Sequence, residues 1–243
     1  RDRQVLRSVS LSVRAGQTLA LVGHSGSGKS TLMALLLRWY DVTPGHGDIA
    51  IDGKSIYDVD LHSLRAAIGH VSQEPLLLAG TVAENIAAGC PGAGLEAISA
   101  AAVTANADGF IRSLPAGYHT EVGERGTALS AGQKQRVALA RAVYADADVY
   151  LLDDPLSALD AHVGAEVFQR CLGRAGALRN RTVVLVTNEL HVLPDVDAVV
   201  FLEAGRVKNT GPFAALMRGD ADFCKLMEEN TGAEAAKSAD RSR

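Results

Sequence analysis

Apolar residues along this chain fall into short continuous runs, separated by longer stretches in which they recur with helical spacing. Four such runs lie at 18–22, 149–152, 183–186 and 198–202. Each run has the length of a strand, and strands that are apolar throughout are typical of a parallel sheet covered on both faces. Helical spacing follows the first run at 31–37 and precedes the second at 132–144. The pattern predicts an α/β fold with a mostly parallel sheet flanked by helices.

Turn residues predict a second, antiparallel part near the N-terminus. Two short apolar stretches within 4–22 are joined by the sequence Arg-Ala-Gly-Gln at 14–17, which predicts paired strands. Segment 47–53 predicts a further strand that ends at an Asp-Gly turn. Together these segments predict an N-terminal antiparallel β subdomain.

Two later regions differ in composition from the predicted sheet. The alanine-rich residues 81–110 predict helices that are interrupted near 90–94 by a proline and glycines. They belong to a predicted helical subdomain at about 75–145. The tail at 230–243 is polar and rich in small residues, without an apolar period, and predicts a disordered linker or tail. The remaining residues, 1–229, form the predicted folded domain.

Composition limits the class of protein. The chain has 243 residues, which suits one large α/β domain, or one domain with a subdomain. Apolar residues make up 47% and aromatic residues only 5%, so aliphatic packing must dominate the core. The formal net charge of -4 argues against a nucleic-acid partner, because a nucleic-acid-binding surface is usually basic.

The cysteines and the longest apolar runs bear on the compartment. Cys90, Cys171 and Cys224 are far apart and lack C-x-x-C spacing, which predicts buried structural thiols in a reducing compartment. The sequence has no recognisable secretory leader, and no apolar run approaches the roughly 20 residues that span a bilayer. We therefore expect the chain itself to be soluble.

Residues 23–31 read GHSGSGKST, a glycine-rich stretch between a predicted strand and a predicted helix. Its members are Gly23, His24, Ser25, Gly26, Ser27, Gly28, Lys29, Ser30 and Thr31. In that context the glycines let backbone N–H groups converge on an anion, and the helix N-terminus adds positive potential. Lys29 is expected to reach the β- and γ-phosphates, and Ser30 to offer its hydroxyl to Mg²⁺. A flexible Gly/Ser turn would not explain the flanking elements, so the stretch predicts a P-loop that binds ATP with Mg²⁺.

Two downstream features extend this chemistry. The run at 149–152 ends in Asp153, a Walker B pattern whose carboxylate helps to hold Mg²⁺; the alternative is a carboxylate that caps a neighbouring helix. A second predicted anion site opens the helix at 132–144. It consists of Leu129, Ser130, Ala131, Gly132 and Gln133. Because the chain has one P-loop, this second element suggests a γ-phosphate supplied by another domain.

In this order the motifs resemble the nucleotide-binding domain of an ATP-binding-cassette (ABC) transporter, over residues 1 to about 228. LSAGQ resembles the family signature LSGGQ, with Ala131 in place of a glycine, and Gln73 matches the Q-loop. The resemblance implies that Gln73 senses Mg²⁺, which Ser30 and Asp153 help to hold. It also implies that Gln73 contacts the membrane domain. The D-loop, which the resemblance places at a dimer interface, matches Ser157, Ala158, Leu159 and Asp160.

The resemblance also points to export, and it differs between the two halves of the chain. The charged, Gly-bounded loop at 120–126 matches a loop of ABC exporters, although taken alone it could simply be solvated. Residues 4–90 look like the P-glycoprotein type. Residues 144–217 look like the first nucleotide-binding domain of the subfamily of multidrug-resistance-associated proteins and the cystic-fibrosis channel.

Two residues depart from the pattern of strongly hydrolytic members. Asp154 stands where those members have a Glu that polarises the attacking water, and it is one methylene shorter. A base withdrawn by roughly 1 Å can cost about 10²-fold in rate, although Asp154 can still accept a proton. Asn188 stands where the family usually has a His, and it can donate a hydrogen bond to the γ-phosphate but cannot titrate. His191 is a less favoured substitute, since a surface or capping role suits it better.

The adenine end of the site is also atypical. The family places an adenine-stacking aromatic residue upstream of the first strands, and the chain begins at Arg1, a few residues too late to include it. Trp39 and Tyr40 lie beyond the P-loop helix and are expected to be packing or surface residues.

These features predict a domain that binds ATP firmly and hydrolyses it slowly. The resemblance implies head-to-tail pairing with a second nucleotide-binding domain, so that the signature of each completes the other's site. It also implies transmembrane domains as partners, the cytoplasmic face of a membrane as location, and no nucleic acid. Unequal sites favour the first cassette of a full exporter. The alternatives are an ATP-gated regulator or channel and, less favoured, a soluble ABC protein of translation or chromosome maintenance, which usually has a basic face.

Overall fold

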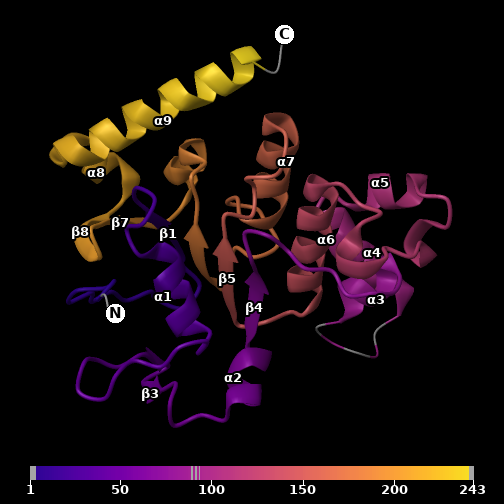
Figure 1. Ribbon diagram of the computed structural model, residues 1–243, viewed down its shortest axis with the longest axis horizontal. Helices are drawn as coiled ribbons and strands as arrows, with labels where there is room; N and C mark the ends of the chain where they lie inside the picture. The colour runs from indigo at the N-terminus through magenta and orange to yellow at the C-terminus, as the bar shows by residue number, and fades with distance from the viewer. Residues whose placement is uncertain (1–3, 89, 91, 93, 241–243) are drawn as a thin grey trace.

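A six-stranded sheet forms the centre of the protein in a computed structural model, which describes residues 4–240 except 89, 91 and 93. The strand order is β4-β5-β6-β1-β7-β8, and only β8 runs antiparallel to its neighbour (Figure 1). The strands are β1 (Thr18–Val22), β4 (Ile68–Val71), β5 (Val149–Asp153), β6 (Thr182–Val186), β7 (Ala198–Glu203) and β8 (Arg206–Gly211). The predicted, mostly parallel α/β sheet is therefore confirmed, and β4 and β8 are additional to the four predicted strands.

Alternate residues of the central strand belong to two different cores, which explains why the strand is apolar throughout. Ala20 and Val22 lie in one cluster, with residues of α6 (Ala131–Tyr144) and α7 (Ala161–Cys171). Leu19 and Leu21 lie in the other, with residues of α1 (Lys29–Leu36) and α2 (Leu61–Ala66). Successive side chains of a strand point to opposite faces, so both faces of this sheet are buried.

A group of helices lies to one side of the sheet (Figure 1). It comprises α3 (Val82–Ala87), α4 (Leu95–Thr104), α5 (Asp108–Ser113) and α6, with the short 3₁₀ turns η1 (Gly117–His119) and η2 (Glu124–Gly126). Both α3 and α6 begin with a capping box, in which the side chain of the residue before the helix accepts a hydrogen bond from a backbone N–H three residues on, and the side chain at that later position accepts one from the backbone N–H of the first. The pairs are Thr81 with Glu84 and Ser130 with Gln133. These helices lie within the range that the sequence assigned to a helical subdomain.

The prediction of paired strands within residues 4–22 is wrong: 18–22 forms β1, but residues 4–17 form no strand, and β1 pairs with β6 and β7 instead. The only separate antiparallel pair among the described residues is the short hairpin of β2 (Ala50–Ile51) and β3 (Lys54–Ser55). The apolar side chains of the first segment do pack against the core on the α1 side of the sheet. Its backbone, however, is interrupted at Ser8, whose φ of 53 is left-handed and cannot continue a strand. Burial and strand pairing are separate properties, and the apolar pattern reported only burial.

The prediction of a disordered tail is also corrected as far as Asp240. After η3 (Leu190–Asp195), β7 and β8, the described part of the chain closes with α8 (Phe213–Gly219) and α9 (Ala221–Asp240), and α9 is the long yellow helix in Figure 1. Alanine, glutamate and lysine are strong helix formers, and they are frequent in the second half of α9. Lack of an apolar period therefore did not exclude a helix. Residues 241–243 of the expected tail lie outside the described residues.

Two smaller expectations concern the membrane and the cysteines. Over the described part of the chain, no helix combines the length and apolarity needed to cross a membrane. Cys171 is buried as predicted, whereas Cys224 is partly exposed and Cys90 is exposed, so the prediction of three buried thiols is wrong for these two.

Candidate functional site

The P-loop connects β1 to α1, and its glycines adopt backbone conformations that other residues avoid. Gly23, Gly26 and Gly28 have φ values of 149, 77 and 108. A Cβ on Gly23 would lie 2.1 Å from the carbonyl oxygen of Leu202, so β7 also enforces glycine at this position. Residues 25–31 line a pocket. No side chain caps the first turn of α1, which leaves its N–H groups available to an anion, as the sequence predicts.

Lys29 is the cation of this pocket. Its side chain is buried, and Nζ donates hydrogen bonds to the carbonyl oxygens of Gly23 at 2.5 Å and His24 at 3.1 Å. Burial lowers the pKa of Lys29, while the nearby carboxylates of Asp153 and Asp154 act in the opposite direction. The two predicted P-loop residues that do not line the pocket, Gly23 and His24, thus hold its lysine.

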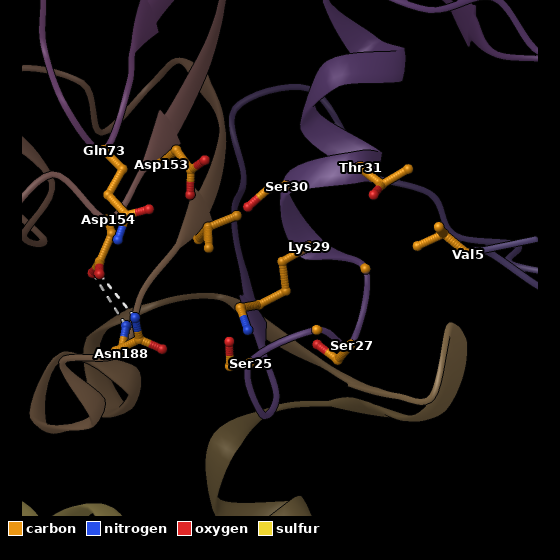
Figure 2. Close-up of a pocket in the computed structure, with 13 residues that line it drawn as sticks. Val5, Ser25, Ser27, Lys29, Ser30, Thr31, Gln73, Asp153, Asp154 and Asn188 are labelled. Atoms are coloured by element: carbon orange, nitrogen blue, oxygen red, sulfur yellow. Dashed lines mark hydrogen bonds between the residues drawn. The ribbon is translucent and has the colours of Figure 1, made fainter. Parts of the chain in front are cut away.

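The opposite side of the pocket is built where three neighbouring strands end (Figure 2). Gln73 follows β4, Asp153 and Asp154 lie at the end of β5, and Asn188 follows β6. Because β4, β5 and β6 are parallel neighbours, their carboxyl ends meet at one edge of the sheet. The fold therefore brings together residues that are 115 positions apart between Gln73 and Asn188 (188 − 73).

The oxygen atoms in this pocket suit Mg²⁺. A carboxylate from Asp153, a hydroxyl from Ser30 and an amide oxygen from Gln73 all line it, and hard cations prefer such oxygen ligands. Burial and the adjacent Asp154 raise the pKa of Asp153, with Lys29 opposing them. This concentration of negative charge fits a cation.

The two atypical residues contact each other. Asn188 donates its side-chain amide to Oδ2 of Asp154 at 2.8 Å and its backbone N–H to Oδ1 at 3.3 Å (Figure 2). Asp154 is only 3% exposed, has a left-handed φ of 49, and donates its own N–H to the carbonyl of Val186 at 2.8 Å. Both carboxylate oxygens are thus engaged by one neighbour, a contact that the sequence did not predict.

The signature and the D-loop lie outside this pocket but contact each other. Ser130 caps α6: its hydroxyl accepts from the N–H of Gln133 at 3.3 Å, and the Gln133 side chain accepts from the N–H of Ser130 at 2.9 Å. A Cβ on Gly132 would lie 2.9 Å from the carbonyl oxygen of Ala158, so the glycine permits close packing of the two motifs. Ala131, by contrast, is exposed, and its methyl group is accommodated. Ser157 donates its hydroxyl to the carbonyl of Asp154 at 2.9 Å, which links the D-loop to the pocket.

The loop at 120–126 is packed rather than merely solvated. Val122 is buried, and its N–H donates to the carbonyl of Gly80 at 2.9 Å. Glu121 pairs with Thr81 in an isolated antiparallel bridge, and Gly126 lies against Leu77. The loop is therefore attached to the segment that follows Gln73.

Sequence reasoning missed two apolar residues that line the pocket, Val5 and Val186. Val186 ends a buried strand and gave no distinguishing signal. Val5 is an exposed residue of an irregular segment, and its place depends on where that segment crosses the fold. Three residues that the sequence analysis placed away from the nucleotide do not line the pocket: His191, Trp39 and Tyr40. His191 is exposed beside Glu189, Trp39 contacts His70, and Tyr40 is exposed.

The parallel sheet, the P-loop and the acidic residues at the strand ends define a nucleotide-binding domain of the P-loop NTPase class. Residues 6–157 match the family model described as ABC transporter. The chain belongs to the ABC transporter family and resembles the ATP-binding domain of its exporters, as the sequence motifs predicted.

Relatives support this assignment over nearly the whole chain. Identity is 43% over 238 residues to the multidrug resistance protein pgp-1 of Caenorhabditis elegans, covering 98% of this chain and 18% of that protein. It is 46% over 210 residues to a multidrug efflux ATP-binding/permease protein of Mycobacterium bovis, covering 86% and 17%. The structure of a bacterial Atm1-family ABC exporter with ATP bound matches with a TM-score of 0.89 and 41% identity, over 95% of this chain and 40% of that one.

The chain therefore spans less than a fifth of the length of these two relatives. Their similarity extends through both halves of the chain, which agrees with the P-glycoprotein type expected for residues 4–90. The expected likeness of residues 144–217 to a different subfamily stays a prediction.

Proposed function

We propose that this domain binds ATP with Mg²⁺ and uses it to drive export by a membrane transporter to which it belongs. Residues 25–31 would hold the phosphates, with Lys29 at the β- and γ-phosphates. Ser30, Gln73 and Asp153 would hold Mg²⁺, which neutralises phosphate charge when bound. The pocket that unites these residues, and the exporters among the relatives, support the proposal.

Within this function, the domain's own site binds ATP firmly and hydrolyses it slowly. The contact between Asn188 and Asp154 carries this proposal. A base must face the attacking water, and both oxygens of Asp154 already accept a hydrogen bond from Asn188. These bonds hold the carboxylate toward Asn188 and occupy one acceptor position on each oxygen, so a water must compete for the positions that are left. The short Asp154 side chain adds a misplacement of roughly 1 Å, which can cost about 10²-fold in rate. An amide at Asn188 also supplies no positive charge toward the γ-phosphate.

The partner completing this site would be a second nucleotide-binding domain in head-to-tail contact. The signature of this chain, centred on Ser130 and Gly132, would then complete the partner's site. Ser130 opens α6, and its hydroxyl lies at a helix N-terminus, where a phosphate is favoured. A slow site paired with a competent one suits the first cassette of a full transporter, at the cytoplasmic face of a membrane.

The double substitution Asp154→Glu with Asn188→His in the intact transporter tests the slow site. We expect ATP turnover at saturating ATP to rise, by up to about 10²-fold at this site, because the longer carboxylate regains its reach and loses the side-chain hydrogen bond from Asn188. Single-turnover hydrolysis of prebound ATP measures the chemical step apart from binding.

Two matched variants separate the contributions. Asp154→Asn keeps the shape but removes the base, so turnover at this site should fall further. Asn188→His alone removes the amide donor on Oδ2 of Asp154 without lengthening the carboxylate side chain, and the backbone N–H at position 188 still reaches Oδ1, so it should give an intermediate rate. If the double variant hydrolyses prebound ATP no faster than the unchanged protein, the slow-site proposal is wrong.

A second candidate function is an ATP-gated regulator or channel with little pumping. The hydrogen bond from Asn188 to Asp154 also favours this function. If hydrolysis is slow, the binding energy of ATP alone can drive closure of the two nucleotide-binding domains. ATP-dependent uptake into membrane vesicles supports the pump, whereas ATP-dependent current without uptake supports the channel.

A further inference from the structure

The turn between β7 and β8 contacts the back of the P-loop. It consists of Ala204 and Gly205, whose φ values of 47 and 78 are both left-handed. The N–H of Gly205 donates a hydrogen bond to the carbonyl oxygen of Ser27 at 3.1 Å. A residue more than 170 positions beyond the P-loop in the chain therefore supports it from behind (205 − 31 = 174).

The irregular N-terminal segment crosses over the same turn. The N–H of Arg7 donates to the carbonyl of Gly205 at 2.7 Å, so both backbone polar groups of this glycine are used. A Cβ on Gly205 would lie 1.9 Å from the carbonyl oxygen of Val5, well inside contact distance. Only a glycine allows the segment to pass this close.

The segment also touches the P-loop directly. A Cβ on Gly28 would lie 2.6 Å from Cδ2 of Leu6 and 3.8 Å from Cα of Gly205. The P-loop, the turn and the segment therefore contact one another. They do so on the side of the pocket that Val5 lines, and Figure 2 shows Val5 beside the P-loop. Through Ser27 and Val5, the position of the turn sets two walls of the nucleotide pocket.

We propose that Gly205 is a positioning residue for nucleotide binding. It holds the P-loop and segment 5–7 at the separation that the ligand requires, without touching the ligand itself. The inference rests on nucleotide binding at the P-loop and is independent of the rate of hydrolysis. A Cβ at Gly205 must push away the backbone of Val5 and Leu6, or move the turn together with its hydrogen bond to Ser27. Displacing a wall of the pocket by about 1 Å is enough to impair a bound geometry.

The β2–β3 hairpin offers a matched control. Its turn, Asp52 and Gly53, has φ values of 51 and 76, nearly those of Ala204 and Gly205, but a Cβ on Gly53 would meet nothing within 4 Å. Gly53→Ala therefore carries the same backbone strain without the collision. Any difference between the two variants reports the contact with the P-loop side of the fold.

The experiment measures the dissociation constant for ATP and the KM and kcat of ATP hydrolysis in the intact transporter. For Gly205→Ala we expect the dissociation constant and KM to rise about tenfold or more, with kcat at saturating ATP changed less. For Gly53→Ala both should stay within about twofold of the unchanged protein. Equal ATP affinity in the two variants would overturn the proposal.

A second pair keeps the test decisive if Gly205→Ala does not fold. Leu6 and Leu11 are both partly buried against the same core, but only Leu6 lies against Gly28. We expect Leu6→Ala to weaken ATP binding more than Leu11→Ala does. Equal effects of the two substitutions on ATP affinity would overturn the proposal. The slow-site proposal is tested by a different quantity, the hydrolysis rate of prebound ATP, so the two proposals can fail independently.

Discussion

Replacing Lys29 with methionine is expected to weaken ATP binding by about 10²-fold or more. Lys29 is the only lysine among the described residues that line the pocket. Charge-assisted hydrogen bonds contribute about 1.5–3 kcal/mol each. Two such bonds to phosphate oxygens account for a loss of this size. Methionine preserves most of the length and volume of the side chain, so the P-loop should keep its shape.

The thermal stability of the nucleotide-free protein should change little. Burial is the larger influence on the pKa of Lys29, so removing the charge relieves a desolvation cost, but it also removes the hydrogen bonds from Nζ to the carbonyl oxygens of Gly23 and His24. We therefore expect nearly unchanged thermal stability without ATP, together with the weaker binding. Lys54→Met, at an exposed position of β3, is the control and should change neither property. Retained affinity in Lys29→Met would show that Lys29 does not hold the phosphates.

Replacing Asn85 with leucine is expected to destabilise the helical subdomain by about 3 kcal/mol or more. Asn85, in α3, is 1% exposed and binds the loop that follows Gln73. Its Oδ1 accepts from the N–H of Leu78 at 2.8 Å and from Arg141 at 2.9 Å. Its Nδ2 donates to the carbonyls of Leu78 at 2.9 Å and Thr81 at 3.0 Å. Leucine fits the volume but leaves these partners without the side-chain amide. Arg141 loses one hydrogen bond and keeps the one from its Nε to the backbone carbonyl at position 85, at 2.8 Å.

Hydrogen exchange in the intact transporter measures this effect locally. A loss of about 3 kcal/mol raises the exchange rate of amides protected by opening of the subdomain about 10²-fold. We expect that increase in α3 and in the first turns of α6, and little change in β1. Asn180→Leu, at an exposed position, is the control.

Adding Arg141→Met to Asn85→Leu tests the cause. With both partners made apolar, the double variant should be less destabilised than the sum of the single variants. Strict additivity would mean that the contact between Asn85 and Arg141 contributes nothing to the subdomain.

Local chemistry made several elements predictable. The P-loop, the strand that ends in Asp153 and the signature at the start of α6 are each complete within about ten residues of sequence. Their glycines and capping residues are required by the backbone conformation at that point. The apolar runs of β1 and β6 predicted burial on both faces of the sheet because side chains alternate along a strand.

Errors arose where a local pattern fitted two structures. The apolar residues of segment 4–17 are partly buried, as expected, but their backbone forms no strand, because Ser8 breaks the extended run. The second half of α9 has no apolar period, yet its alanine and glutamate content favours a helix.

The sequence by itself determined the class of this protein, the phosphate-binding loop and the departures at Asp154 and Asn188. Only the tertiary structure decided that these last two hold each other, since they stand 34 residues apart and meet where β5 and β6 end side by side. Likewise, nothing near Gly205 in the chain indicates that Ser27 and Arg7 bind it. Short-range patterns record what the backbone requires locally, whereas these contacts depend on strand order and on the path of distant segments.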